Sequence, residues 1–296
     1  EILACSDPPI RMIWVTAGNP VSMLPDSASL REAFQRSEFN VVVDTHPTDT
    51  TDLAHLVLPT LTLLEDDDVL GAYGNHFLRA SRPAVEPPGE ARHELWIWQR
   101  LAGRLGLGDL LEGSPRDWKR RLLRPEVSLE EVERGAVRNP TAPLVLFADR
   151  RFPTVTGRVN LLTEAPENPV RLTPEYPLSL LAVSVPQAQS SQWSVAAPSP
   201  PEVRVHPDSA AGLRDGCEAR LESRLGALRV VVRHDPAVHA EVALMAKGGM
   251  LRAGACANAL VEARETDGGG GAAFYDQPVR LVGLQERAEP VGQDPP

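Results

Sequence analysis

The sequence is poor in cysteine. Its 296 residues include three cysteines, Cys5, Cys217 and Cys256, which lie far apart and form no Cys-x-x-Cys pair. This spacing predicts neither an iron–sulfur cluster nor a zinc site in the chain. We expect free, buried thiols, which suit a reducing compartment and predict a cytoplasmic protein.

Long apolar runs and an excess of positive charge are also missing. No apolar run is long enough to span a membrane and no signal peptide opens the sequence, so direct membrane insertion is not expected. Acidic residues outnumber basic ones and give a formal net charge of −10. Nucleic acid is therefore not an expected partner, and an anionic ligand would have to be held by local donors such as backbone N–H groups.

The start of the sequence is unusual. It reads Glu1-Ile2-Leu3-Ala4-Cys5, a segment typical of the end of a helix rather than of a natural N-terminus. We therefore expect the chain to be a fragment or a split subunit of a larger enzyme.

The first half of the sequence has the pattern of an α/β domain. Residues 11–16 and 39–43 are apolar, β-branched runs typical of buried strands. A helix is predicted between them, with Asp26 and Ser29 as candidate caps and a capping box at residues 29–32, and the three elements would form a right-handed βαβ unit. A further apolar strand at residues 56–58 ends at Pro59.

Polar residues follow two of these strands. Gly18, Asn19 and Pro20 follow the first strand, and Asp44 follows the second directly. Ligands of open α/β sheets collect at the carboxyl ends of strands. The carboxylate of Asp44 can accept two hydrogen bonds from an N–H/NH2 edge such as that of guanine, and residues 48–50 can cap a following short helix.

The second half has a different pattern. A proline-rich stretch at residues 166–177 predicts a linker, and short strands separated by turn residues follow it. Near the end, four glycines at 268–271 lie between Asn258 and Phe274. Each glycine costs backbone entropy on folding, so the run indicates a backbone that must lie against a flat or anionic ligand. The alternative is a flexible glycine loop.

In order and spacing, these motifs resemble the molybdopterin oxidoreductases of the dimethyl sulfoxide reductase family. The similar segments are residues 18–20, 39–68, 85–106, 152–158 and 258–276. The resemblance implies an α/β domain with a mainly parallel sheet at residues 1–165, the linker at 166–177, a double-psi β-barrel domain at 178–284 and a disordered tail at 285–296.

The resemblance also implies a function. The chain would bind molybdopterin guanine dinucleotide as the C-terminal part of an enzyme that carries two such cofactors with molybdenum or tungsten and catalyses two-electron redox of a small-molecule substrate. Any iron–sulfur cluster and the metal's protein ligand would lie in the N-terminal half, which is the expected partner. No catalytic residue and no metal ligand are expected in this chain, which alone would be inactive. The implied cofactor-binding residues are Gly18, Asn19, Pro20, Asp44, Thr45, Thr48, Asn258, Gly269, Gly270 and Phe274.

The sequence departs from the family pattern at three places. His55 and Val261 stand where aspartate and threonine are usual, and residues 187–193 replace a frequent His-His-x-x-Asn-Ser segment. The replacement at 187–193 favours an alternative, a non-catalytic scaffold subunit that retains the fold without the cofactor, whereas the presence of Asp44 and of the glycine run speaks against it. A third alternative is an unrelated α/β nucleotide-binding enzyme, but the first strand is not followed by Gly-x-Gly-x-x-Gly.

Overall fold

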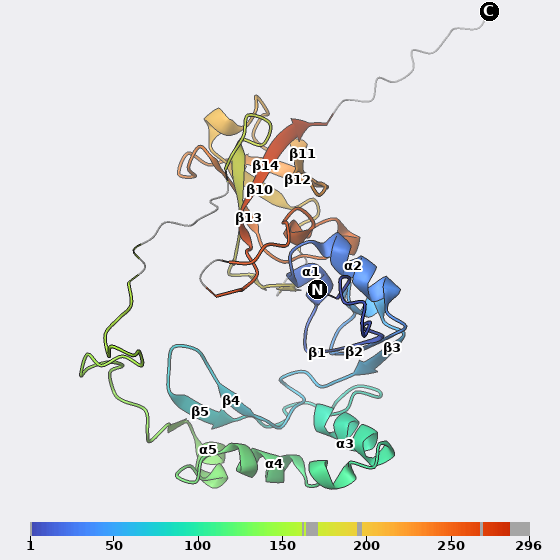
Figure 1. Cartoon of the computed structure of the whole chain (residues 1–296), viewed down its shortest axis with the longest axis vertical. Coiled ribbons are helices and arrows are strands. Elements are labelled where there is room, and N and C mark those ends of the chain that lie inside the picture. The colour runs from blue at the N-terminus through green and yellow to red at the C-terminus, as the bar shows by residue number, and fades with distance from the viewer. Residues whose placement is uncertain (1, 162, 164–170, 194–196, 267–268, 285–296) are drawn as a thin grey trace, which may run out of the picture. The chain divides into compact units, whose positions relative to one another are not determined.

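The computed structural model describes all residues except 1, 162, 164–170, 194–196, 267–268 and 285–296 (Figure 1). Contacts divide the chain into two compact units, residues 1–42, 47–57 and 166–296 in the first, and residues 43–46 and 58–165 in the second. The first 42 residues thus group with the C-terminal strands. The predicted domain boundaries at residues 165 and 178 stay a prediction. The predicted tail and most of the predicted linker lie outside the described residues.

The N-terminal region has the predicted α/β arrangement, with a parallel sheet in the order β1-β2-β3. Its core is the β-branched run 41–43 in β2, in which every side chain is buried. The strand β3 is half-exposed along its length. The elements of this region are β1 (Met12–Thr16), α1 (Pro20–Met23), α2 (Ser27–Arg36), β2 (Phe39–Asp44), the short helix η1 (Thr51–Leu53) and β3 (Leu56–Pro59).

Of the two predicted caps of α2, Asp26 and Ser29, the structure uses Asp26, and the capping box at Ser29 does not form. The helix begins at Ser27, and Asp26 is the N-cap, accepting from the Ser29 backbone N–H at 3.0 Å. The Ser29 hydroxyl donates to the same carboxylate at 2.6 Å. A carboxylate is a stronger acceptor than a hydroxyl at a helix N-terminus, so Asp26 takes the cap from Ser29.

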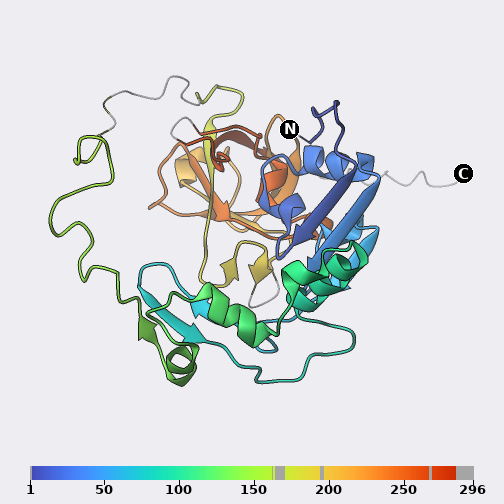
Figure 2. The same ribbon diagram turned by 60° about the horizontal axis from the view of Figure 1, so that its bottom comes forward.

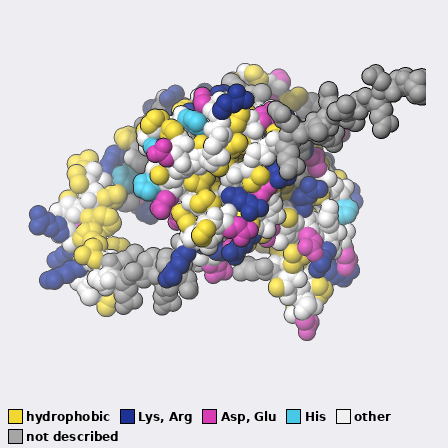
Figure 3. All heavy atoms as spheres, turned by 90° about the horizontal axis from the view of Figure 1, so that it is seen from above, with side chains coloured by type: hydrophobic (Ala, Val, Ile, Leu, Met, Phe, Trp, Pro, Cys, Tyr) yellow, Lys and Arg dark blue, Asp and Glu magenta, His cyan; other side chains and the backbone are white. Residues whose placement is uncertain are grey.

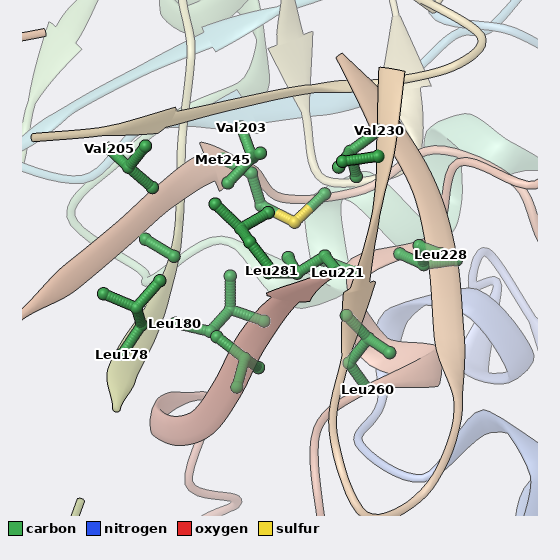
Figure 4. Close-up of a cluster of buried hydrophobic side chains, with 14 of the residues drawn as sticks. Leu178, Leu180, Val203, Val205, Leu221, Leu228, Val230, Met245, Leu260 and Leu281 are labelled. Atoms are coloured by element: carbon green, nitrogen blue, oxygen red, sulfur yellow. The ribbon is translucent and has the colours of Figure 1, made fainter. Parts of the chain in front are cut away.

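The C-terminal strands form a closed six-stranded barrel in the order β10-β12-β11-β14-β7-β13. Two of its pairs, β10 with β12 and β13 with β7, are parallel and the other four are antiparallel. Alternate side chains point inward and meet in one apolar core (Figure 4). The predicted barrel is confirmed. Its elements are β7 (Leu178–Val183), β10 (Glu202–Val205), η3 (Pro207–Ser209), β11 (Glu218–Glu222), β12 (Ala227–His234), β13 (Val242–Ala246), η4 (Leu251–Ala253), η5 (Ala257–Ala259) and β14 (Tyr275–Gly283).

The last barrel strand, β14, is absent from the sequence analysis. Asp276 lies in the left-handed region with φ 62°, at a bulge between Tyr275 and Gln277. Gln277 is buried, with its side-chain oxygen accepting from the Glu262 backbone N–H at 2.9 Å. A buried glutamine followed by Pro278 breaks the alternation of apolar and polar residues, which hides the strand from pattern analysis.

The second unit contains a small antiparallel sheet and three helices. The sheet has the order β4-β5-β6. Figure 2 shows the helices α3 to α5 in green. Ser114 and Ser128 both form capping boxes, at α4 and α5 respectively. The elements are β4 (Val69–Gly71), β5 (Phe77–Ala80), α3 (Glu94–Arg104), η2 (Gly108–Leu111), α4 (Pro115–Leu122), α5 (Leu129–Arg134) and β6 (Val137–Arg138).

Within the described residues, no helix is long and apolar enough to cross a membrane. Figure 3 shows acidic and basic side chains interspersed over the visible face. That face therefore has no large patch of one charge that could attract a polyanion.

Candidate functional site

The turn after β1 holds a buried amide with an unused donor. Asn19 is 3% exposed, and its side-chain oxygen accepts from the hydroxyl of Thr50 at 2.7 Å and from the Thr50 backbone N–H at 3.2 Å. Its side-chain nitrogen, Nδ2, has no hydrogen-bond partner among the described residues. Leaving a buried donor unpaired costs about 1–3 kcal/mol, so an unpaired amide suits a site completed by a ligand.

Gly18, next to Asn19, is not required by the fold of the chain. A Cβ added at this position would have its nearest neighbours at 3.8–3.9 Å, which is ordinary van der Waals contact. Its neighbour Ala17, by contrast, adopts φ 50°, a strained value for a residue with a side chain. The space beside Gly18 is therefore available to a ligand that approaches the backbone.

The turn after β13 contains two glycines, Gly248 and Gly249, that the packing of the chain requires. A Cβ on Gly248 would lie 1.8 Å from the carbonyl oxygen of Ser190, in the hairpin formed by β8 (Ala188–Gln189) and β9 (Gln192–Trp193). A Cβ on Gly249 would lie 2.4 Å from the carbonyl oxygen of Ala255. Both glycines also have positive φ, so they allow two other segments to pack against the end of β13.

A cavity of about 480 Å³ lies on the barrel beside these glycines. Such a volume falls within the usual range for small-molecule sites. Its walls come from the ends of β7, β10 and β13 and from the β8–β9 hairpin, and they are mostly apolar. The lining residues are Val183, Val185, Pro186, Gln187, Trp193, Ala197, Pro198, Pro201, Glu202, Arg204, Leu244, Met245, Ala246, Gly249 and Ala255.

Several polar side chains line this cavity, among them Trp193, Glu202 and Arg204. The indole Nε1 of Trp193 is buried without a hydrogen-bond partner among the described residues. Glu202 pairs with Arg233 at 2.8 Å, while the guanidinium of Arg204 is half-exposed, with Asp235 3.9 Å away. The cavity thus offers an aromatic ring with an unused donor and a positive charge. Gln187 and Trp193, the ends of the segment 187–193 that departs from the family pattern, both line the cavity.

The segment that follows the turn at Gly248 and Gly249 contains Asn258, which is buried. Its side-chain nitrogen donates to the backbone carbonyl of Ser22 in α1 at 2.9 Å, and the Cys256 thiol donates to the same carbonyl at 3.2 Å. Contacts between α1 and η5 and between α2 and η5 follow from this packing. Asn258 therefore ties the barrel to α1, whatever its role toward a ligand.

The predicted caps at residues 48–50 act differently from one another. The N-cap of η1 is Thr50, whose side chain makes no cap hydrogen bond, while the hydroxyl of Thr48 accepts from the backbone N–H of Thr51, the first residue of η1, at 3.2 Å. The carboxylate of Asp49 instead accepts from the backbone N–H groups of Leu251 and Arg252, at 2.7 and 3.1 Å. The sequence analysis missed this contact because its partners are about two hundred positions away.

The glycine run forms an exposed turn, of which residues 267 and 268 lie outside the described part of the chain. Gly270 has φ 62°, and the N–H of Gly271 donates to the Thr266 hydroxyl at 3.1 Å, so these two residues serve the turn. Gly269 has no positive φ, and a Cβ there would meet nothing within 4 Å. Phe274 follows the turn and is half-buried.

Asp44 and Thr45 belong to the second unit. Asp44 ends β2, as predicted, and its Oδ1 accepts from the Thr45 backbone N–H at 2.7 Å. The Thr45 hydroxyl lies 2.9 Å from Nδ1 of His46. No described residue donates to the second carboxylate oxygen of Asp44, which leaves it available for a ligand.

The buried thiol of Cys256 gives the site a testable pH dependence. Burial raises the pKa of Cys256, so the folded chain keeps this thiol protonated where an exposed thiol ionises, at about pH 8.5. The unfolded chain therefore loses a proton that the folded chain retains, and the free energy of unfolding falls as the pH rises. Urea unfolding at about pH 7 and pH 9.5 should show this fall, and Cys256→Ala should reduce it. An equal fall in both proteins would contradict the prediction.

Comparisons with known proteins match both halves of the chain. Residues 3–104 match the family described as molybdopterin oxidoreductase, and residues 186–278 match the Molydopterin dinucleotide binding domain. The probable oxidoreductase YyaE of Bacillus subtilis is 31% identical over 97% of this chain, which spans 46% of that protein. Biotin sulfoxide reductase of Cereibacter sphaeroides is 37% identical over 34% of this chain and 13% of its own length.

A solved structure has the same fold. Acetylene hydratase from Pelobacter acetylenicus superposes with a TM-score of 0.72 and 20% identity, over 93% of this chain and 44% of that one. The chain thus spans a little under half the length of YyaE and of this structure. Among the described residues, no group of three or more His, Cys, Asp or Glu could hold a metal ion.

Proposed function

Because this chain belongs to the molybdopterin oxidoreductase family, we propose that it is the C-terminal, cofactor-binding part of a molybdenum or tungsten enzyme that catalyses two-electron redox of a small substrate. The cofactor is molybdopterin guanine dinucleotide, two per complete enzyme. The N-terminal half, joined covalently or as a separate subunit, supplies the metal's protein ligand and any iron–sulfur cluster. All three cysteines are free, as predicted, but the prediction that they are buried holds only for Cys256, since Cys5 is exposed and Cys217 is half-buried. Free thiols suit a reducing compartment, so the proposed location is the cytoplasm.

The observation that carries this proposal is the barrel cavity. It lies largely within the segment that matches the dinucleotide-binding domain, and its wall contains a buried indole N–H with no described partner. When bound, the cofactor supplies the redox chemistry through its metal. The chain's own residues bind and orient it. The Trp193 ring offers a face for stacking and its Nε1 a donor, and Arg204 offers a charge to a phosphate.

The remaining predicted residues fit other parts of a dinucleotide. The free carboxylate oxygen of Asp44, together with Oδ1, can accept from the N–H/NH2 edge of guanine. The unpaired amide of Asn19 can donate to a carbonyl or phosphate oxygen, and the backbone beside Gly18 and Gly269 can be approached closely. Each contact is proposed for its own unit, that of Asp44 in the second and those of Gly18, Asn19 and Gly269 in the first, and none of these residues is assigned a proton transfer.

The alternative is a scaffold subunit that retains the fold and has lost the cofactor. The observation that favours it is that two residues of the departing segment 187–193, Gln187 and Trp193, line the cavity. Nucleotide analysis separates the two functions. The chain is produced with the rest of the enzyme, the purified complex is hydrolysed in acid, and released guanine nucleotide is measured. The proposal requires guanine nucleotide in the complex, and its absence would favour the scaffold.

Gly269→Val provides a finer test of the cofactor site. Position 269 has ordinary φ and open space, so the isolated chain should unfold at an unchanged temperature, while the valine side chain blocks the approach of a ligand to the backbone. Cofactor content of the complete enzyme should fall by about tenfold or more, the scale of one lost close contact. If Gly269→Val unfolds the barrel, or if it leaves cofactor content unchanged, the glycine does not face the cofactor.

Gly270→Val is the matched comparison in the same turn. Its φ of 62° disfavours any side chain, so this variant should lose about 1–2 kcal/mol of stability in addition to its effect on cofactor content. A difference in stability between the two variants with a similar loss of cofactor would separate the role of the turn from the role of the site.

A further inference from the structure

Asp49 is a buried carboxylate with three donors. It is 5% exposed, and besides the Leu251 and Arg252 backbone N–H groups it accepts from the hydroxyl of Ser22. The two N–H groups belong to the first residues of η4, where a helix leaves its N–H groups without internal partners. Asp49 therefore caps a helical turn that is formed by a distant part of the chain.

Ser22 connects this cap to the predicted cofactor residues. Its hydroxyl donates to Asp49, and its carbonyl accepts from the side chain of Asn258. Asn19, three positions earlier, is held through Thr50, the residue after Asp49. One carboxylate thus lies at the centre of a network that joins the 18–20 turn, the 48–50 turn and the segment from Leu251 to Asn258. Figure 1 shows α1 and α2 beside the barrel segment that carries η5.

The junction between the 48–50 turn and η4 also has exposed contacts, and these contribute less to stability than the hydrogen bonds of Asp49. The Arg252 guanidinium lies 3.3 Å from the carboxylate of Asp52 and donates to the Pro47 carbonyl at 2.8 Å. Both side chains of this ion pair are about half-exposed, and exposed pairs contribute little to stability. The position of η4 therefore depends chiefly on Asp49.

A purely structural junction would not need a buried charge. Apolar side chains of similar volume usually stabilise a buried contact at least as well as an ionised group, because the charge must be desolvated. The carboxylate provides directional hydrogen bonds. Its three hydrogen bonds fix one relative placement of the segments that it joins. This property matters where a ligand has to find several groups already in position.

From this geometry we infer that Asp49 is the positioning residue of the cofactor site. Resting on the proposed function, the inference is that Asp49 holds the Gly18–Pro20 turn and the Asn258 segment in register before the cofactor binds. Asp49 does not touch the cofactor. Its loss should leave a folded chain in which the two segments are no longer aligned.

The test compares Asp49→Asn with Asp52→Asn in the chain produced with the rest of the enzyme. Asparagine keeps one acceptor and the volume but removes the charge. Cofactor content per folded enzyme should fall by about tenfold in Asp49→Asn, within the usual range of coupling between sites. It should stay within about twofold of wild type in Asp52→Asn, which removes only the exposed pair.

Hydrogen exchange of the chain without cofactor supplies the second measurement. The amides of Leu251 and Arg252 should be protected in wild type and in Asp52→Asn and should exchange faster in Asp49→Asn. If Asp49→Asn fails to fold, Ser22→Ala replaces it, because it removes one of the three hydrogen bonds and should cause a smaller loss of cofactor.

The possible failures are distinguishable. A wild-type enzyme without guanine nucleotide overturns the proposed function and this inference with it. A wild-type enzyme that carries cofactor, beside an Asp49→Asn enzyme that carries as much, overturns the inference alone. A lower unfolding temperature in Asp49→Asn with unchanged cofactor per folded enzyme also overturns it, because the carboxylate would then serve stability only.

Discussion

Replacing Gly249 with alanine should unfold the barrel or bring it close to unfolding. The new Cβ would lie 2.4 Å from the carbonyl oxygen and 2.9 Å from the carbonyl carbon of Ala255, and both are buried backbone atoms that cannot rotate away. The residue would also have to adopt φ 84°, which a side chain disfavours. We expect a loss of about 4 kcal/mol or more in the free energy of unfolding, the range of severe core changes. Urea unfolding of the isolated chain measures it.

Gly254→Ala is the matched control. Gly254 lies five positions further along the same segment and also has positive φ, 63°, but a Cβ there meets nothing within 4 Å. It should cost only about 1–2 kcal/mol, the penalty for a side chain in the left-handed region. Equal losses in the two variants would show that backbone conformation, and not the close approach to Ala255, explains the glycine at 249.

Replacing Asp44 with alanine should deplete the complete enzyme of guanine nucleotide. Asp44 stands at the carboxyl end of a buried strand, and only one of its oxygens is occupied by a described residue. Losing a charged partner of a buried hydrogen-bonded pair costs about 2–5 kcal/mol of affinity. Guanine nucleotide released from the purified enzyme measures the effect.

Asp68→Ala controls for the loss of an aspartate as such. Asp68 belongs to the same unit, and its carboxylate accepts from the next backbone N–H at 2.7 Å, as Asp44 does. It should leave cofactor content unchanged. Full loading of the Asp44→Ala enzyme would remove Asp44 from the site.

The sequence was sufficient to predict the elements that are held by their own residues. The run at 41–43 predicts a buried strand because its β-branched side chains are themselves the core, and it is buried. The capping boxes at Ser114 and Ser128 each join residues that are three positions apart, so their spacing can be read directly from the sequence. Such local contacts can be derived from spacing alone.

Contacts between distant segments could not be predicted in this way. The partners of Asp49 lie about two hundred residues away, so nothing near it indicates a cap for η4. Glycine is required at 248 and 249 because the backbones of Ser190 and Ala255 pack closely against them, and only folding brings these residues together. The cavity depends on the ends of three strands that are not consecutive in the chain.

The link between Asp49 and η4 has a consequence for the synthesis of the chain. Its partners are separated by 202 residues, so η4 cannot be capped until nearly the whole chain has left the ribosome. At about 5–20 residues per second, the segment around β2 waits roughly 10–40 seconds for them. During that time its buried face is open to chaperones and to aggregation. Stalled chains that end before Gly248 should therefore be cut by protease within residues 12–57, and chains extended past β14 should resist.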